Sequence, residues 1–472
     1  MKLSSPMAIW KYLPGTNCGD CGEKTCLAFA SLLKERKKHV KECTPLFTDE
    51  KYLDKGKQLV ELLAPEIREV SIGVGARARK IGGEDVMHRH ELTFFNRTAL
   101  AYDVWDTMDA DALRDRVTKI TNWQKFYVGD FLTVDAIAIR SVSGDADTFA
   151  ACVKAVAEET DLPLVLCSFD ATVLEAGLKE VADKNPLLYA AEKTNWKEVL
   201  RLARSYNVPV TLFSPDLDML NSLAATFSAA GVEDIVLDPG TYPTGKGLAD
   251  TFSKLVQLRR AGIVDGNKSV TYPLMTVPLT AWLVYGDENA VDASYWEAIL
   301  ATMSIIKYAD ITISHSIEPH SLIAERTLVE NVYTDPRRPV SVEPGLREIG
   351  TPTADSPLFL TTNFALTYYT VESDLSSNKI DSYLMVADTE GIGVEAAVAG
   401  GQLNADTIKE TLDSCEAEKK LKYKTLVLPG LAARLSGETE DATGWNMLVG
   451  PRDSGRIPGW MDDNWPPKTV SE

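Results

Sequence analysis

The feature that most constrains the fold is a unit that repeats along the middle of the chain. Between residue 91 and about residue 315, a short apolar run rich in β-branched residues is followed each time by a longer segment with helical spacing of its apolar side chains. Such alternation is typical of a parallel sheet covered on its faces, and eight units are the number in a TIM barrel. An open doubly wound sheet is the competing arrangement. The eight predicted strands are residues 92–96, 136–141, 163–169, 187–191, 209–214, 234–240, 274–279 and 310–315.

Two further zones flank the predicted barrel. The first 60 residues hold four of the seven cysteines. After them, a glycine-rich stretch lacks the Gly-Lys-Ser/Thr ending of a P-loop, so we expect a glycine-turned hairpin there. Beyond a Pro-rich join, strand and helix signals predict a small α/β domain of Rossmann or flavodoxin type. The predicted bounds are 1–60 for the cysteine domain, 61–90 for the hairpin linker, 91–332 for the barrel, 333–356 for the join and 357–472 for the last domain.

The formal net charge of −19 argues against nucleic-acid binding, because phosphate contacts require a basic face. No apolar run approaches the roughly 20 residues that cross a bilayer, and the start of the chain lacks the apolar core of a signal peptide. We therefore expect a cytoplasmic protein with no membrane partner. The charge is uneven, since residues 1–60 contain 11 Lys and Arg against 7 Asp and Glu. The basic run at 34–41 predicts either a solvated helix face or a docking patch for an acidic partner.

Three cysteines fall within nine positions near the N-terminus, at Cys18, Cys21 and Cys26, and Cys43 follows them. In a cytoplasmic protein, four thiolates indicate a metal site rather than disulfides. Zinc ribbons use two matched Cys-x2-Cys pairs, whereas the second half here is a single cysteine. The spacing therefore favours a [4Fe-4S] cluster over zinc. The three other cysteines lie in apolar patterns and are expected to pack as small apolar side chains.

The strands predicted in the last domain run into glycine at their ends, in the segments 388–394, 427–433 and 447–455. Open α/β sheets bind ligands at the carboxyl ends of their strands, where glycine allows close approach. This domain has no histidine, and the chain has no haem motif, so a metal bound here would have to bring its own equatorial ligands. A corrinoid does so with four ring nitrogens. Without a histidine as lower ligand, Co(II) is more easily reduced to Co(I), a step within reach of a low-potential cluster.

Long motifs in a fixed order carry a specific resemblance. They are NCGDCGEKTCLAFA (17–30), IGVGARARKIGGEDVMHRHELTFFN (72–96), EPGLREIGTP (343–352), LTTNFALTYYTVESDL (360–375), VADTEGIGVEAAVAGG (386–401) and GWNMLVGPRDSG (444–455). By these motifs, the chain resembles over essentially its whole length the large (gamma) subunit of the corrinoid iron–sulfur protein of the acetyl-CoA decarbonylase/synthase complex, in the form found in methanogenic archaea.

The resemblance implies a [4Fe-4S] cluster on the four clustered cysteines, a central TIM (β/α)8 barrel, and a corrinoid without a lower axial base on the C-terminal domain. Relatives usually show Cys-Pro at the fourth ligand, and here Thr44 intervenes. Bacterial relatives often carry a hydroxyl residue where Ile392 stands, so the implied floor under the corrin is apolar. The implied corrinoid contacts are Thr361, Thr367, Gly391, Ile392, Gly393, Val394, Gly430, Gly450 and Arg452.

The implied function is that of a methyl carrier. Co(I) takes the methyl group of a methyltetrahydropterin (tetrahydrosarcinapterin in methanogens), and methyl-Co(III) passes it to the nickel–iron–sulfur site of the synthase subunit, with reversed flow in acetate breakdown. The cluster returns oxidised Co(II) to Co(I). The chain would thus be the methyltransferase component of a complex. Its implied partners are a small (delta) corrinoid protein subunit in a heterodimer, the synthase subunit and the CO dehydrogenase-containing complex.

Two other functions remain open. Polar residues at the strand ends of the barrel could bind the methylpterin directly and make this chain the methyltransferase itself, whereas a scaffold would use the top of the barrel to dock the small subunit. The last domain could instead bind flavin in a plain electron-transfer protein. The strand-end candidates are Asn96, Asp170, Asp238 and Ser314.

Overall fold

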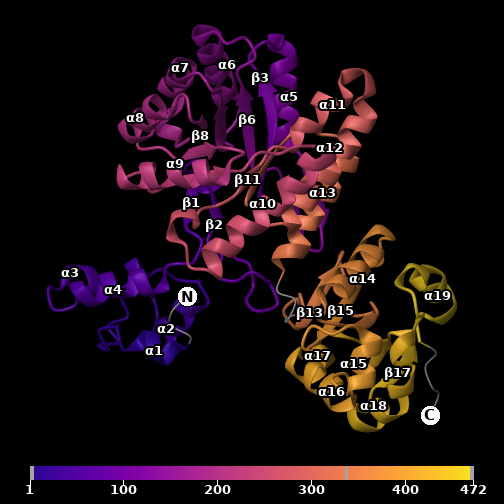
Figure 1. Cartoon of the computed structure of the whole chain (residues 1–472). Helices are drawn as coiled ribbons and strands as arrows, with labels where there is room; N and C mark the ends of the chain where they lie inside the picture. Colours follow the sequence, from indigo (N-terminus) through magenta and orange to yellow (C-terminus); the bar gives the residue numbers. More distant parts are fainter. Residues whose placement is uncertain (1–4, 335–338, 468–472) are drawn as a thin grey trace. The chain divides into compact units, whose positions relative to one another are not determined.

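The computed structural model describes residues 5–334 and 339–467, and the chain divides into two compact units (Figure 1). The first unit comprises residues 1–125 and 132–333, and the second comprises residues 126–131 and 334–472. The segment 126–131 is the tip of a hairpin, β4 (Gln124–Tyr127) and β5 (Asp130–Thr133), that the sequence pattern did not predict. Within the second unit, the Phe126 ring packs against Tyr369 with 6.1 Å between the ring centroids.

The first unit begins with a small helical module that has its own apolar core, which includes Ile9, Phe29 and Leu46. The guanidinium of Arg36 connects this module to the next segment, because it pairs with Asp85 and lies 4.2 Å from the centroid of the Phe95 ring. The helices of the module are α1 (Pro6–Trp10), α2 (Cys26–Lys34), the 3-10 turn η1 (Val40–Glu42), α3 (Pro45–Thr48) and α4 (Leu53–Leu63).

An antiparallel hairpin follows, which confirms the expected glycine-turned hairpin: β1 (Glu69–Ile72) pairs with β2 (Arg79–Gly82). The predicted strand at 92–96 is wrong, because these residues form no strand and the first barrel strand begins at Ala99. The side-chain amide of Asn96 donates to the Gly82 carbonyl at 2.7 Å and to a Glu69 carboxylate oxygen at 3.0 Å. These bonds hold the segment against the hairpin instead of a neighbouring barrel strand.

Eight parallel strands form a nearly closed barrel in the order β10-β9-β8-β7-β6-β3-β12-β11. A bridge between Leu237 and Leu274 joins the two edge strands, so the barrel arrangement is confirmed and the open sheet is excluded. Seven predicted strands coincide with observed ones. The barrel strands are β3 (Ala99–Trp105), β6 (Ala136–Arg140), β7 (Leu164–Cys167), β8 (Leu187–Ala191), β9 (Val210–Phe213), β10 (Ile235–Asp238), β11 (Met275–Thr276) and β12 (Ile311–Ser314).

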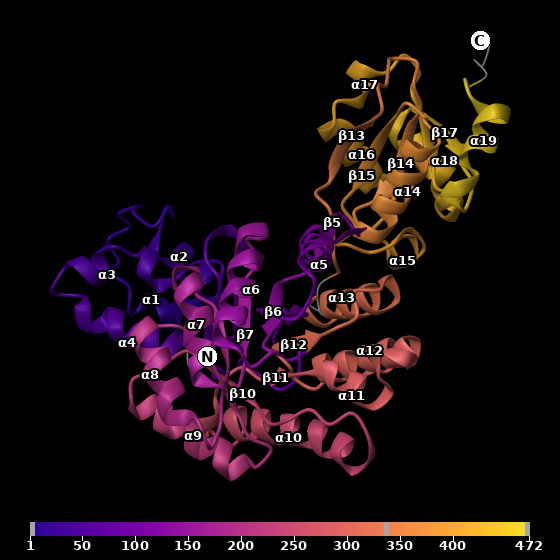
Figure 2. The same cartoon turned by 90° about the horizontal axis from the view of Figure 1, so that it is seen from above.

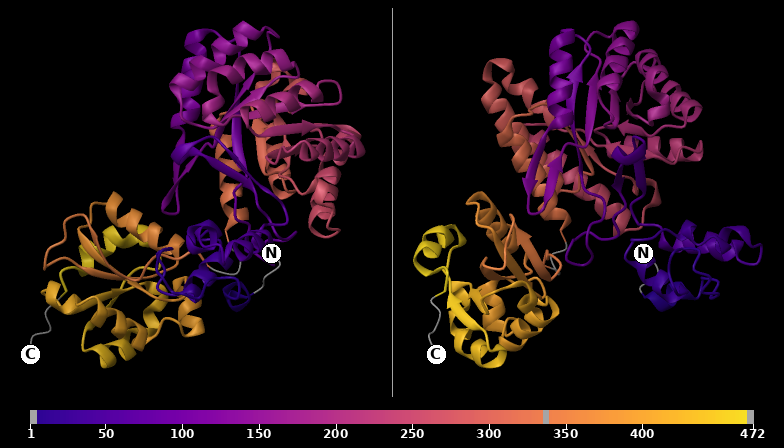
Figure 3. Two further views of the ribbon diagram at one scale, coloured as in Figure 1. Left: turned by 90° about the vertical axis from the view of Figure 1, so that its left-hand side faces the viewer. Right: turned by 180° about the vertical axis from the view of Figure 1, so that it is seen from behind.

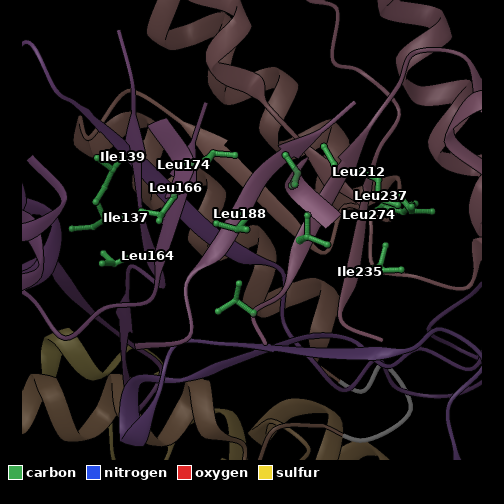
Figure 4. Packing of buried hydrophobic residues seen from close by; sticks show 14 of the residues in the cluster. Ile137, Ile139, Leu164, Leu166, Leu174, Leu188, Leu212, Ile235, Leu237 and Leu274 are labelled. Carbon is green, nitrogen blue, oxygen red and sulfur yellow. The ribbon is translucent and has the colours of Figure 1, made fainter. Parts of the chain in front are cut away.

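Helices surround these strands (Figure 2), and aliphatic side chains fill the layer between them (Figure 4). Ile137, Leu166 and Leu212 in that layer are completely buried, and each such side chain contributes about 1.5–3 kcal/mol. None of the helices in the described ranges is long and apolar enough to cross a membrane. The helices are α5 (Ala110–Asn122), α6 (Ala146–Glu159), α7 (Ala171–Val181), α8 (Trp196–Tyr206), α9 (Leu217–Ala229), α10 (Gly245–Ile263), α11 (Trp282–Tyr285), α12 (Ala290–Ile306) and α13 (Pro319–Tyr333).

The buried carboxyl of Glu84, which follows β2, makes the stability of the first unit depend on pH. The residue is 3% exposed, and burial raises the pKa of its carboxyl to about 8, with the Asp310 charge adding to the effect and Arg259 and Arg36 opposing it. A folded-state pKa above the unfolded value means that the folded chain holds the proton more tightly. Stability is therefore greatest below the unfolded pKa near 4.5 and falls as the pH rises through about 8.

Replacing Glu84 with Gln is expected to remove this dependence, because a neutral amide needs no proton. At pH 9 the free energy of unfolding should rise by an amount on the order of 3 kcal/mol, and at pH 4 it should hardly change. Urea unfolding monitored by circular dichroism at both pH values measures the difference. The matched control is Glu158→Gln, since Glu158 is exposed on α6. An equal effect at pH 4 and pH 9 would contradict the assignment.

The second unit contains a five-stranded sheet in the order β13-β15-β14-β16-β17, in which β13 is antiparallel and the other strands are parallel. Helices lie on both faces of this sheet (Figure 3), and each face has its own buried core. Strand β13 lies inside the predicted join, of which residues 335–338 are outside the described residues. The elements are β13 (Gly345–Ile349), β14 (Leu358–Thr362), α14 (Ala365–Ser377), β15 (Ser382–Ala387), α15 (Val394–Gly400), α16 (Ala405–Ser414), α17 (Ala417–Lys420), β16 (Thr425–Leu428), α18 (Ser436–Thr443), β17 (Asn446–Val449) and α19 (Ile457–Asn464).

Candidate functional site

The four N-terminal cysteines line one small cavity, although their side chains differ in solvent exposure. Cys18 is exposed, Cys21 is half-buried, and Cys26 and Cys43 are buried; none of them forms a disulfide. The backbone N–H of Cys26 donates to the side-chain oxygen of Asn17 at 2.8 Å, which holds the first turn of α2 against the loop that carries Cys18 and Cys21. The structure therefore brings together all four residues predicted as cluster ligands.

In the described parts of the chain, no group of three or more His, Cys, Asp or Glu side chains is placed to hold a metal ion. The preference for an iron–sulfur cluster over zinc therefore rests on the spacing of the four cysteines. Burial raises the pKa of the Cys43 thiol to about 11, so this side chain needs a cationic partner to become a thiolate.

The Lys38 side chain contacts the loop that carries the cysteines. Its ammonium donates to the backbone carbonyl of Cys21 at 3.1 Å and to the carboxylate of Glu42 at 2.8 Å. The Glu42 carboxylate also accepts from the backbone N–H of His39 at 2.8 Å, which closes the η1 turn just before Cys43. These contacts fix the spacing between the second and fourth cysteines of the cavity.

A second cavity, of about 330 Å³, lies in the second unit at the carboxyl ends of β14, β16 and β17. Its wall is mostly apolar and includes Leu366, Val371 and Leu431. Five of the nine residues predicted to contact a corrinoid line it: Thr361, Thr367, Val394, Gly450 and Arg452.

The other four predicted contacts are neighbours of this cavity and do not line it. Gly430 donates its backbone N–H to the Pro451 carbonyl at 3.0 Å, directly beside Gly450. A Cβ on Gly393 would lie 3.7 Å from the Thr367 hydroxyl, so the turn 391–393 runs past the lining helix α14. Ile392 is partly buried against the core of the second unit. Its side chain thus anchors the turn 391–393 to that core.

The Thr361 side chain provides a test of whether the cavity suits a large group with polar edges. Thr361 is 1% exposed at the end of β14, and its hydroxyl has no hydrogen-bond partner among the described residues. An unpartnered buried hydroxyl is unfavourable by about 1–3 kcal/mol unless a ligand bonds to it. Apolar walls with one such hydroxyl fit a corrin, whose faces are apolar and whose periphery carries amides.

Asn363 is a residue of this site that the sequence reasoning missed. It is 5% exposed, and its side-chain oxygen accepts from the backbone N–H groups of Thr389 at 3.0 Å and Gly391 at 2.9 Å and from the Thr389 hydroxyl at 3.0 Å. Its amide donates to Asp388 at 3.0 Å. One side chain therefore fixes the whole loop from β15 to the Gly391–Val394 turn. The only signal in the sequence is a polar residue that directly follows a strand.

Replacing Asn363 with Ala is expected to leave two buried backbone N–H groups of that loop without acceptors. The free energy of unfolding should fall by about 2 kcal/mol, as measured by urea unfolding. The control is Asn378→Ala at the end of α14, where an exposed amide donates once, to the Asp374 carbonyl at 2.8 Å. Equal losses in both variants would show that Asn363 does not hold the loop.

The four strand-end candidates of the barrel do not form one site. Asn96 is not at a strand end, and Asp170 caps α7 by accepting from the backbone N–H of Thr172 at 2.7 Å. Asp238 does lie at the end of β10, where it accepts from the Tyr189 hydroxyl at 2.8 Å and burial raises its pKa to about 6. Ser314 ends β12 and is 1% exposed. A different group, centred on Asp103 and His315, occupies the strand ends instead.

Two family models and solved structures match parts of this chain. The family model described as CO dehydrogenase/acetyl-CoA synthase delta subunit matches residues 69–461, and the model named FeS, for an Fe-S cluster, matches residues 13–45. A solved dihydropteroate synthase from Thermus thermophilus is similar at a TM-score of 0.40 and 16% identity, covering 56% of this chain and 98% of that one.

Curated relatives match from end to end. The acetyl-CoA decarbonylase/synthase complex subunit gamma of Methanosarcina acetivorans is 56% identical, covering 99% of this chain and 100% of the relative. The subunits gamma of Archaeoglobus fulgidus and Methanopyrus kandleri are 54% and 39% identical, over 99% and 98% of this chain and 100% and 98% of the relatives. This chain therefore belongs to the family of gamma subunits of the acetyl-CoA decarbonylase/synthase complex.

Proposed function

We propose that this chain is the corrinoid- and iron–sulfur-containing methyl carrier of its complex. The observation that carries the proposal is the cavity of the second unit: apolar walls, an unpartnered buried Thr361 hydroxyl, and no histidine in residues 357–472. A haem or a mononuclear metal that is held by histidine would need a ligand that this domain lacks. A corrinoid supplies its own four nitrogens and a nucleophilic cobalt that accepts a methyl group.

The residues of the second unit would hold the corrinoid as follows. Thr361 and Thr367 would present hydroxyls from β14 and α14, Arg452 would present a guanidinium from the β17 end, and Val394 would present an apolar side chain. The turn Gly391-Ile392-Gly393 would support Val394 from outside the cavity wall. No histidine of this domain could bind the cobalt of a corrinoid, and a cobalt without such a ligand would be easier to reduce. The parallel strands have the order β15-β14-β16-β17, which is the start of the flavodoxin-type order and supports a doubly wound domain.

The cysteine cavity would hold a [4Fe-4S] cluster on Cys18, Cys21, Cys26 and Cys43, and the match to an Fe-S cluster family over residues 13–45 supports this. The role that we propose for the cluster is reductive reactivation, since cobalt that has lost an electron no longer attacks a methyl group. Gly19 and Gly22 both have φ of +84°, a conformation that lets the loop turn tightly around such a cluster.

The proposed methyl donor is a methyltetrahydropterin, tetrahydrosarcinapterin in methanogens, and the proposed acceptor is the nickel–iron–sulfur site of the synthase subunit. The chain would act as the methyltransferase component in a heterodimer with the small (delta) corrinoid protein subunit, within the CO dehydrogenase-containing complex. The names of the curated relatives support assembly into such a complex.

A UV–visible spectrum of the anaerobically purified chain, together with cobalt and iron analysis, tests the proposal. Corrinoid bands above a broad iron–sulfur shoulder, with one cobalt and four irons per chain, are expected. A flavin spectrum without cobalt would contradict the proposal and support an electron-transfer protein instead.

A further inference from the structure

A cluster of charged and aromatic side chains lies at the carboxyl ends of β3, β6 and β12. At its centre Asp103 is completely buried, and its carboxylate accepts from Nε of Arg140 at 2.7 Å, from Nη2 of Arg116 at 3.0 Å and from Nδ1 of His315 at 2.7 Å. The carboxyl ends of the strands are where TIM barrels place substrate-binding and catalytic groups. Buried ion networks are also weak sources of stability, so packing alone does not account for this one.

Asp103 remains ionised in spite of its burial. Burial by itself would raise the pKa of this carboxyl, but the hydrogen bond from His315 and the charges of Arg140 and Arg116 lower it below its usual value. A carboxylate only accepts hydrogen bonds, which makes Nδ1 of His315 the donor. Nε2 is then the ring nitrogen left to exchange a proton, the same division of roles that an aspartate imposes on a catalytic histidine.

The His315 ring is fixed on several sides. Its backbone N–H donates to the buried carboxylate of Glu297 at 2.6 Å. The Trp282 ring meets it edge-on with 4.4 Å between centroids, and the Trp105 ring lies at 5.6 Å. In the described part of the chain, Nε2 has no hydrogen-bond partner. The side chain is 19% exposed, so a small molecule can reach it.

Arg116 and Arg140 lie beside the indole ring of Trp105, and some of their N–H donors make no hydrogen bond within the described residues. Both guanidiniums lie 5.7 Å from the centroid of the Trp105 ring. Arg140 uses only Nε for Asp103, is 33% exposed, and makes no hydrogen bond through either Nη within the described ranges. A free pair of Nη donors is the geometry that binds a carboxylate or phosphate side by side. The neighbouring Asp106 does not compete, because donors of Ser141, Val142 and Ser143 saturate it.

We infer that this end of the barrel is a second ligand site, which binds a planar ring with an acidic side chain, and that His315 exchanges a proton with the ring. The site combines aromatic surfaces, an oxyanion receptor and a proton-exchanging nitrogen, which are the needs of a reduced pterin with a carboxylate or phosphate tail. The identity of this ligand rests on the proposed function, in which a methylpterin is the methyl donor.

The proton from His315 would make the pterin a better leaving group during methyl transfer. When the methyl group leaves N5 of the pterin, the C–N bond breaks and its electron pair stays on N5, while the electron pair of the attacking nucleophile forms the new bond to carbon. A tertiary amine is a poor leaving group unless its nitrogen receives a proton as the bond breaks. Protonated Nε2 of His315 supplies that proton and regains one from water. In the reverse direction Nε2 accepts it.

Binding tests the oxyanion receptor. Quenching of tryptophan fluorescence by methyltetrahydropterin is measured with the full chain carrying its cluster and corrinoid. In the Arg140→Met variant the dissociation constant should rise at least ~10-fold, the loss expected for one charged hydrogen-bonded contact. The control is Arg201→Met, which removes an exposed guanidinium paired with Glu175 on the helix layer. Equal affinity in Arg140→Met and the unsubstituted chain would contradict the assignment of Arg140 as the group that binds the acidic side chain of the ligand. An absence of saturable quenching would contradict it as well.

Rates of methyl transfer test whether His315 donates a proton to the pterin. The variant His315→Asn keeps an amide donor for Asp103 but has no nitrogen that exchanges protons. Methyl transfer from methyltetrahydropterin should slow ~100-fold or more, whereas methylation by methyl iodide, whose leaving group needs no proton, should stay within a factor of two. Equal rates from the pterin in both chains would overturn the role of His315. A chain that reacts with neither donor would overturn the proposed function itself, and the pterin assignment with it.

Discussion

The Cys26→Ala variant is expected to lose reductive reactivation completely while it retains methyl transfer from cobalt that is already reduced. Cys26 is buried at the N-terminus of α2, and its backbone N–H bonds to Asn17. In the proposed cluster the Cys26 thiolate would bind one of the irons, so its removal would leave that iron without a protein ligand. The second cavity, which we propose as the corrinoid site, belongs to the other unit, and none of its lining residues changes. The rate of Co(I) recovery after oxidation, followed by UV–visible spectroscopy with a low-potential reductant, measures the effect.

Cys415→Ala is the matched control, because Cys415 is a half-buried thiol at the end of α16, outside both cavities. This variant should keep its four irons and its rate of reactivation. Reactivation at the normal rate in Cys26→Ala would refute the role of the cluster. Loss of transfer from preformed Co(I) would show that the cluster is part of the methyl-transfer step as well.

The Gly430→Ala variant is expected to reduce the corrinoid content to below a tenth of that of the unsubstituted chain. A Cβ at Gly430 would lie 2.7 Å from the backbone nitrogen of Arg452 and 2.8 Å from the Gly450 carbonyl oxygen. Both contacts are to backbone, which cannot rotate away, so the loop after β17 must shift. That loop contributes Gly450, Pro451 and Arg452 to the cavity wall. Overpacking of this kind also destabilises by about 1–3 kcal/mol.

Gly437→Ala serves as the control, since a Cβ on Gly437 in α18 meets no atom within 4 Å. Alanine is also the better helix former by about 1 kcal/mol, so this variant should be at least as stable and bind corrinoid fully. Cobalt analysis and urea unfolding of the two proteins give both quantities. Full corrinoid content in Gly430→Ala would show that the ligand does not occupy this cavity.

The barrel could be predicted from sequence because its strands are buried on both sides and read as plain apolar runs. The exception is β3, which carries Asp103 two residues before its carboxyl end. A charged residue in a strand breaks the apolar pattern, so the pattern favours the apolar run at 92–96 instead. The partners that make the charge tolerable, Arg116, Arg140 and His315, come from three other elements. Such long-range pairing is not visible in the local sequence.

The candidate sites could be predicted to different degrees, because some depend on local spacing in the sequence and others on contacts between distant residues. The cysteine spacing is local, and the structure places all four thiols around one cavity. Glycines at strand ends indicated where the second cavity lies, although four of the nine named residues support its wall without lining it. Asn363 acts through hydrogen bonds to a loop some 25 residues away. Only the folded chain shows that one amide holds that loop.

The central claim is a cobalt centre without a protein or base nitrogen below it, and electron paramagnetic resonance of the Co(II) state tests it most directly. The sample is the purified chain with its cluster, held at a potential where cobalt is Co(II). We expect a Co(II) corrinoid signal whose cobalt hyperfine lines show no further splitting by an axial nitrogen. A threefold nitrogen splitting of those lines, or a sample without a cobalt signal, would contradict the account.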